Sequence, residues 1–167
     1  LPRVMRATLG YDHELPWGVR ATLEGVYTET QEDVYYQNLN RAPTGNTSFD
    51  GRPLYTRKST AFLDTVILRN TSKGEQLNAS LRLTKRFDMG LYVDASYAWM
   101  DAESAFDSTS SRAISSWRFM PVRGDIYNPE MSTTNWEVEH NFNIALSYAF
   151  NIGSLGNTVA LFYNAQS

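Results

Sequence analysis

Apolar and polar residues alternate with a period of two in several segments of the chain. This is the period of a β-strand, whose successive side chains point to opposite faces. The apolar positions of these segments carry no charged residue, whereas the opposing positions include Arg6, Arg20, Arg82, Asp12, Glu24 and Asp94. We therefore predict an all-β fold of antiparallel strands with one apolar and one polar face. The predicted strands comprise residues 5–11, 19–27, 77–84, 91–99, 142–150 and 159–163.

Short and long connections alternate between these strands. The short ones, at 13–18, 87–90 and 151–157, each contain the glycine that tight turns favour. The long ones, at about 37–61 and 104–135, show no periodic internal structure. Long unstructured loops are uncommon in compact soluble domains, but they are usual on the outer side of outer-membrane barrels. The alternation places all short turns at one end of the sheet and all long loops at the other.

Aromatic residues lie at both ends of the predicted strands. Trp17 and Tyr27 bracket one strand, and Phe87 and Trp99 bracket another. A tilted strand of about ten residues spans roughly 25 Å along the membrane normal, which is the height of the apolar band between two aromatic girdles. The spacing therefore predicts a segment of a transmembrane β-barrel. Alternation alone also describes a soluble, secreted β-sandwich that binds glycans through exposed aromatics, and this is the alternative.

Composition excludes several other classes. The 167 residues contain no cysteine, which excludes disulfides and cysteine-based metal sites. A hydrophobic content of 42% with 13% aromatics argues against disorder. The longest apolar run, 159–163, is far too short for a transmembrane helix. A net charge of −3 argues against a nucleic-acid partner.

Several dispersed segments carry a family resemblance. The sequence Leu68-Arg-Asn-Thr-Ser-Lys-Gly-Glu75 leads into a Leu-rich strand at 77–87, a turn at Gly90, and the strand Ala95-Ser-Tyr-Ala-Trp-Met-Asp-Ala-Glu103. Further segments of the same pattern are 49–55, 109–117, 139–150 and 161–167. Together they resemble the barrel of TonB-dependent outer-membrane receptors, and among these the Oar-like group.

The resemblance implies a function in the bacterial outer membrane. Receptors of this kind are 22-stranded barrels closed by a plug and energised by the TonB complex. By this resemblance, residues 1–167 are a fragment of the barrel, without the plug and the N-terminal domains. The implied partners are the lipid bilayer with its lipopolysaccharide, the remaining strands and plug, TonB acting through the plug, and an extracellular ligand. The implied role is uptake, with adhesion or export as alternatives that the sequence does not separate.

The candidate chemical residues favour a structural role over catalysis. His140 has the parity of the apolar face near a long loop, and the strand serines Ser80, Ser96 and Ser147 have the opposite parity, so we expect no Ser–His pair. His13 is expected in a short turn. The acidic residues Asp101, Glu103 and Asp107 lack the spacing of a calcium loop. We therefore expect no enzyme activity, no cofactor and no metal.

Two groups of charged residues remain. Arg41, Arg52, Arg57 and Lys58, with Asp50, make the first long loop locally basic. We interpret this as ordinary loop charge, and the alternative is a surface that attracts acidic ligands or lipopolysaccharide phosphates. The charged residues of the polar face are expected to form a network inside the barrel that contacts the plug. No ligand-binding residue is assigned from the sequence.

Overall fold

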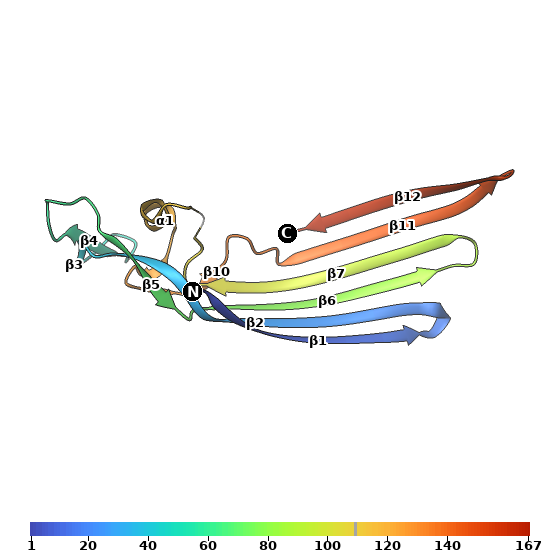
Figure 1. The fold of residues 1–167 in the computed structure, drawn as a ribbon, viewed down its shortest axis with the longest axis horizontal. Helices are drawn as coiled ribbons and strands as arrows, with labels where there is room; N and C mark the ends of the chain where they lie inside the picture. Colours follow the sequence, from blue (N-terminus) through green and yellow to red (C-terminus); the bar gives the residue numbers. More distant parts are fainter. Residues whose placement is uncertain (109) are drawn as a thin grey trace. The chain divides into compact units, whose positions relative to one another are not determined.

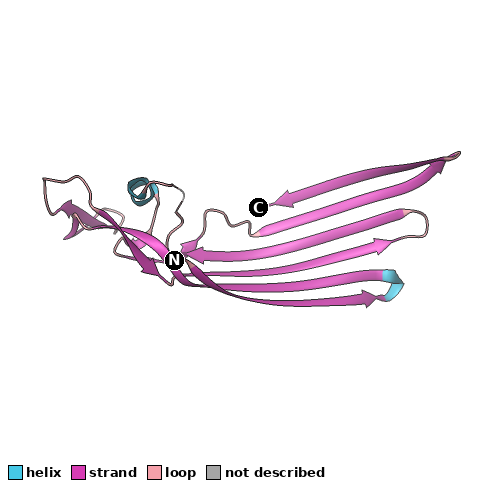
Figure 2. Ribbon diagram, viewed as in Figure 1, coloured by secondary structure: helices cyan, strands magenta, loops and turns pink. Residues whose placement is uncertain are grey.

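The computed structural model describes residues 1–108 and 110–167, so Thr109, the first residue of the 109–117 segment, lies outside the described residues. Strands make up most of the chain, as the period-two pattern predicts (Figures 1 and 2). The chain forms two compact units. The strand unit comprises residues 6–28, 76–101 and 136–167, and the loop unit comprises 1–5, 29–75 and 102–135. Neither described helix is long and apolar enough to cross a membrane.

All six predicted strands are confirmed, and each is longer than its pattern. They pair in chain order, with Leu146 of the fifth strand opposite Val93 on one side and Leu161 on the other. Among the described residues, the first and last strands each have one hydrogen-bonded neighbour, so the barrel is not closed. The strands are β1 (Arg3–Leu15), β2 (Val19–Asn38), β6 (Gly74–Arg86), β7 (Leu91–Ser104), β11 (His140–Ile152) and β12 (Leu155–Gln166).

The apolar face of the strand unit is uncovered in the described residues. Most of its leucines and tyrosines are exposed, with Leu9 at 79% and Leu161 at 63%. The buried hydrophobic residues, Ala102, Ala105 and Phe106, all belong to the loop unit. A sandwich would bury this face against a second sheet. The β-sandwich alternative is therefore wrong for this chain, and the face requires an apolar environment outside it.

The short turn at 87–90 is confirmed with its predicted bounds, and the other two are tighter than predicted. β1 extends to Leu15 and thereby includes His13, and a 3₁₀ turn η1 (Pro16–Gly18) follows it, with Trp17 at φ 66° and Gly18 at φ 69°. Ile152 pairs with Leu155, so the last turn has only two residues. Strand pairing continues this far because each added pair satisfies two more backbone groups.

The prediction of long loops without internal structure is wrong. The first contains a hairpin of β3 (Arg41–Thr47) and β4 (Pro53–Arg57), and β5 (Val66–Thr71) then pairs with the end of β2. The second contains α1 (Ala113–Phe119), a hairpin of β8 (Arg123–Asp125) and β9 (Asn128–Glu130), and β10 (Ser132–Thr133) paired with β7. These strands show no alternation because most of their residues are exposed or half-buried, so no face is selected to be apolar.

Candidate functional site

A carboxylate with three partners organises the loop unit. The Asp64 side chain, only 5% exposed, lies just before β5. Its Oδ1 accepts hydrogen bonds from Asn38 Nδ2 at 2.6 Å and from Arg41 Nη2 at 2.9 Å, and its Oδ2 accepts one from Arg118. The partners come from the end of β2, the start of β3 and α1. One buried acid therefore links both long loops.

Two asparagine side chains support this carboxylate by fixing the surrounding backbone. Asn38, fully buried, accepts hydrogen bonds at Oδ1 from the backbone N–H groups of Asn40 and Thr65, at 3.0 and 3.1 Å. Asn40 donates from Nδ2 to the carbonyls of Ser59 and Phe62, at 3.0 and 2.7 Å. The first loop thus satisfies its buried polar groups through side-chain amides in place of strand pairing.

Further hydrogen bonds join the second loop to the first. The Tyr127 hydroxyl donates to the carbonyls of Asn38 and Arg41, at 2.9 Å to Asn38. The Tyr55 hydroxyl donates to Asp125 Oδ1 at 2.6 Å. Because these contacts bridge segments far apart in sequence, the two loops form one folded structure.

Lys73 adds another link between distant segments of the loop unit. Its Nζ donates to Asn128 Oδ1 and to the Pro129 carbonyl, both at 2.8 Å. The hairpin of β8 and β9 is therefore tied to the segment that follows β5.

The electrostatics of the loop unit follow from these contacts. The hydrogen bond from Arg118, helped by those from Arg41 and Asn38, lowers the pKa of Asp64 to about 2, although burial acts in the opposite direction. Asp64 is therefore ionised at neutral pH. Burial, with the hydrogen bond to Asp125, raises the pKa of Tyr55 to about 12. Two guanidinium groups facing one carboxylate leave a net charge of +1 at this point.

An apolar groove lies beside the Asp64–Arg118 pair. Its walls come from the segment before β5, from β5 itself and from α1. Phe62 is 64% exposed and Leu63 is 63% exposed, although both belong to a polar loop. The lining residues are Ala61, Phe62, Leu63, Asp64, Val66, Ala113, Ile114 and Arg118. The groove is shallow and open to solvent, with an apolar floor and one ion pair at its edge.

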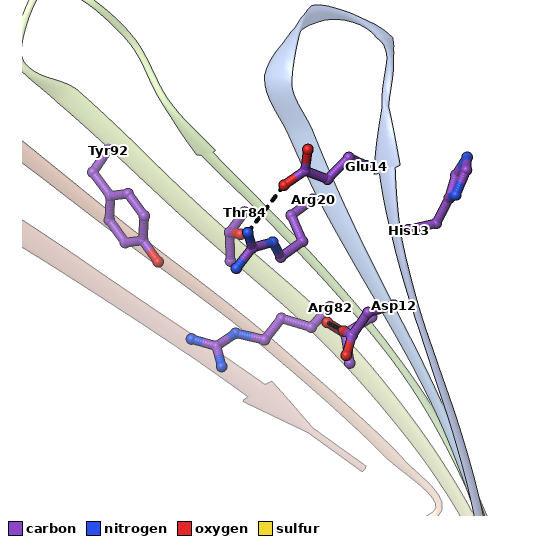
Figure 3. A pocket seen from close by; sticks show the side chains of 8 residues that line it. Asp12, His13, Glu14, Arg20, Arg82, Thr84 and Tyr92 are labelled. Carbon is purple, nitrogen blue, oxygen red and sulfur yellow. Dashed lines mark hydrogen bonds and ion pairs between the residues drawn. The ribbon is translucent and has the colours of Figure 1, made fainter.

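The charged residues of the polar face form separate pairs. Arg82 binds Asp94, with Nε to Oδ1 at 2.9 Å. Arg20 binds Glu14 at 3.0 Å, a partner that the sequence pattern missed (Figure 3). Asp12 accepts a hydrogen bond from the Thr22 hydroxyl, and Arg6 donates to the Thr28 hydroxyl. An open polar hollow is lined by Asp12, His13, Glu14, Arg20, Thr22, Arg82, Thr84 and Tyr92.

Asparagines continue the polar face toward the chain end. Asn143 and Asn164 lie opposite each other on β11 and β12. Asn164 Nδ2 donates to Asn143 Oδ1 at 2.7 Å and to Asn141 Oδ1 at 3.2 Å. Neutral, hydrogen-bonded side chains of this kind suit the watery interior of a barrel.

Each histidine pairs with a tyrosine on the apolar face. His140 Nδ1 and the Tyr97 hydroxyl share a hydrogen bond of 2.8 Å, and His13 Nδ1 and the Tyr11 hydroxyl share one of 3.3 Å. The alternation along β6, β7 and β11 directs Ser80, Ser96 and Ser147 to the opposite, polar face.

The remaining charged candidates are dispersed. Asp107 binds the Ser104 hydroxyl and the Asn135 backbone N–H, and Glu103 lies opposite Thr133 in the strand pairing. Within 1–108 and 110–167, no three acidic or histidine side chains are close enough to hold a metal ion. In the first loop, Arg52 pairs with Asp50 at 2.5 Å. The central role of Asp64 could not be predicted from the sequence, because its partners lie far away in the chain.

These features together define a class of protein. Long antiparallel strands with an uncovered apolar face, an opposing polar face and alternately short and long connections form the wall of a membrane β-barrel. The sequence matches the family described as outer membrane beta barrel domain over residues 1–161, and the chain belongs to that family. It is therefore a protein of the bacterial outer membrane, whose apolar face lies in the lipid environment. No curated protein and no solved structure matches the chain.

Proposed function

We propose that this chain forms part of the wall and the outer loops of a TonB-dependent receptor of the Oar-like group. The observation that carries the proposal is the structural role of two residues of the resembling motif, Lys73 and Gly74. Lys73 holds the β8–β9 hairpin. A Cβ at Gly74 would lie 2.6 Å from the Thr30 hydroxyl oxygen, so the position admits only glycine without rearrangement. Both residues of the motif therefore have a structural role in the loop unit, and this supports the resemblance.

The open edges of the sheet are consistent with a larger barrel. Unpaired backbone groups cannot face hydrocarbon, because no water is present there to hydrogen-bond them. β1 and β12 therefore need further strands beside them, which a 22-stranded receptor would supply. In this proposal the strands form part of the barrel wall, and the loop unit captures an extracellular ligand. TonB acts on a plug inside the barrel. Import, adhesion and export all fit these roles.

The test is to express the full coding region and ask whether its product binds the periplasmic domain of TonB. We expect a plug-like domain encoded ahead of the barrel, and co-purification of the full protein with TonB. Deletion of the plug should abolish co-purification while the barrel still inserts. A coding region without a plug, or a product that does not bind TonB, would refute the proposal.

We also propose that the chain has no catalytic activity. His140 has a tyrosine as its hydrogen-bond partner and lies on the face opposite the strand serines, which supports this proposal. The test is hydrolysis of a short-chain p-nitrophenyl ester by the purified protein and by the His140→Ala variant. Hydrolysis that is lost in the variant would overturn it.

A further inference from the structure

The groove of the loop unit combines two features that rarely occur together on a polar loop. Phe62 and Leu63 expose most of their side chains to solvent. Directly beside them lies an ion pair in which the partly exposed Arg118 contacts the buried Asp64. Water in contact with large apolar side chains is unfavourable, and a ligand that covers them gains by excluding it.

The charge beside this apolar surface is positive. Asp64 is the one acidic residue among the described lining residues, and it is shared between Arg41 and Arg118. The Arg41 guanidinium has two contacts: it donates to Asp64, and it lies over the Trp117 ring at 5.5 Å from the ring centroid. Arg118 binds Asp64 through Nη2, and its side chain is 45% exposed. Since a guanidinium has five donors, Arg118 is the group available to bind an added anion.

A second arginine stands next to the groove. Arg112 is exposed and directly precedes Ala113, a lining residue of α1. The charge around the apolar surface therefore complements a negative headgroup attached to an apolar body. A neutral or cationic amphiphile would gain the same apolar contact without this attraction.

From this geometry we infer that the groove binds a free, water-borne carboxylate amphiphile with a short alkyl body. The carboxylate accepts hydrogen bonds from Arg118, and the alkyl chain covers Phe62, Leu63 and Ile114. A free ligand is favoured over a membrane lipid because every lining residue of the groove belongs to the loop unit, and none belongs to the lipid-facing strands. This inference rests on the proposed ligand-capturing role of the loops and names the class of ligand.

The test measures binding of octanoate, octanol and octylammonium to the full protein in lipid nanodiscs, by saturation-transfer NMR with empty nanodiscs subtracted. We expect octanoate to bind at least about tenfold more tightly than the other two, because it alone gains a charge-assisted hydrogen bond. Arg118→Gln should remove that preference, and Arg118→Lys should keep part of it. Leu63→Ser should weaken octanoate and octanol together.

The matched control is Arg123→Gln, which removes an exposed arginine of the same unit that pairs with Glu130 outside the groove. It should leave octanoate binding unchanged. Hydrogen exchange of the β3 and β4 amides verifies in each variant that the loop unit is folded. Equal binding of all three probes, octanoate binding that survives Arg118→Gln, or a signal equal to that of empty nanodiscs would overturn the inference. TonB is absent from this experiment, so such a result would leave the transport proposal standing.

Discussion

Asp64 and Arg118 lie 54 positions apart in the sequence and form an ion pair that joins the two long loops. The carboxylate is almost completely buried, and Arg41 binds its other oxygen. The loops are therefore held by a defined polar centre, although each belongs to a different strand connection. The stability of the loop unit should depend on this centre.

Asp64→Asn should destabilise the loop unit by about 2 kcal/mol. Removing one partner of a buried pair leaves an uncompensated charge, which typically costs about 3–5 kcal/mol. Arg118 is 45% exposed, so water lessens the cost. Hydrogen exchange of the β3 and β4 amides measures the effect, with the amides of β7 and β11 as an internal reference. Glu130→Gln, which breaks an exposed pair, is the control and should change exchange little. Equal protection in Asp64→Asn and wild type would contradict this prediction.

Acid should open the loop unit in a defined pH window. The pKa of Asp64 falls from its ordinary value of 3.8 to about 2 in the folded state. A lowered folded pKa means that its stabilising contribution is complete above about pH 4 and is lost as the pH falls toward 2. The protection factors of the β3–β4 amides, which correct for the pH dependence of intrinsic exchange, should therefore fall between pH 4 and 2 in the wild type. The Asp64→Asn variant should lack this step, and its presence there would assign the step to another group.

Alkali should act on the Tyr55–Asp125 contact. Because the folded pKa of Tyr55 is raised from 10.0 to about 12, the neutral phenol contributes stability below pH 10, and this is lost as the pH rises toward 12. In a titration followed by absorbance at 295 nm, Tyr55 should ionise near pH 12. The difference between wild type and Tyr55→Phe isolates its curve. A difference curve centred near pH 10 would refute the prediction.

The strands were predictable only where a bilayer selects one face. Leu77, Leu81 and Leu83 alternate with polar residues because one side meets lipid and the other meets water. The end of β2, from Thr28 to Asn38, carries polar residues on both sides, so the pattern ends while the strand continues. In the loop hairpins no face is buried, and periodicity therefore carries no information about them.

The candidate site was less predictable than the strands for a different reason. Asp64, Asn38 and Arg118 are ordinary polar residues in their local sequence, and only the fold brings them together. The pairing of Arg20 with Glu14 was missed in the same way, because β1 extends beyond the alternating pattern. The placement of His140 on the apolar face could be predicted, because it follows from strand parity alone.

Gly90 and Gly153 test how turn geometry supports strand pairing. Both have a positive φ, of 89° and 62°, so alanine is strained at either position. A Cβ at Gly90 would additionally lie 2.3 Å from the Ala149 carbonyl oxygen, whereas a Cβ at Gly153 meets nothing within 4 Å. Gly153→Ala should cost about 1 kcal/mol, and Gly90→Ala should cost clearly more. Urea unfolding in liposomes measures both, and equal losses would show that the turn near Gly90 adjusts freely.

Leu81 and Ser80 are neighbours on β6 that point to opposite faces, and they test which face meets lipid. Leu81→Arg would place a charge in hydrocarbon, which costs about 2–4 kcal/mol near the middle of the bilayer. Ser80→Arg would place the same charge on the polar face, where Arg82 already pairs with Asp94, and should cost less than about 1 kcal/mol. Unfolding of the full protein in liposomes measures both variants in the same strand. The reverse order of losses would mean that the polar face meets lipid, and an equal loss would mean that neither face does.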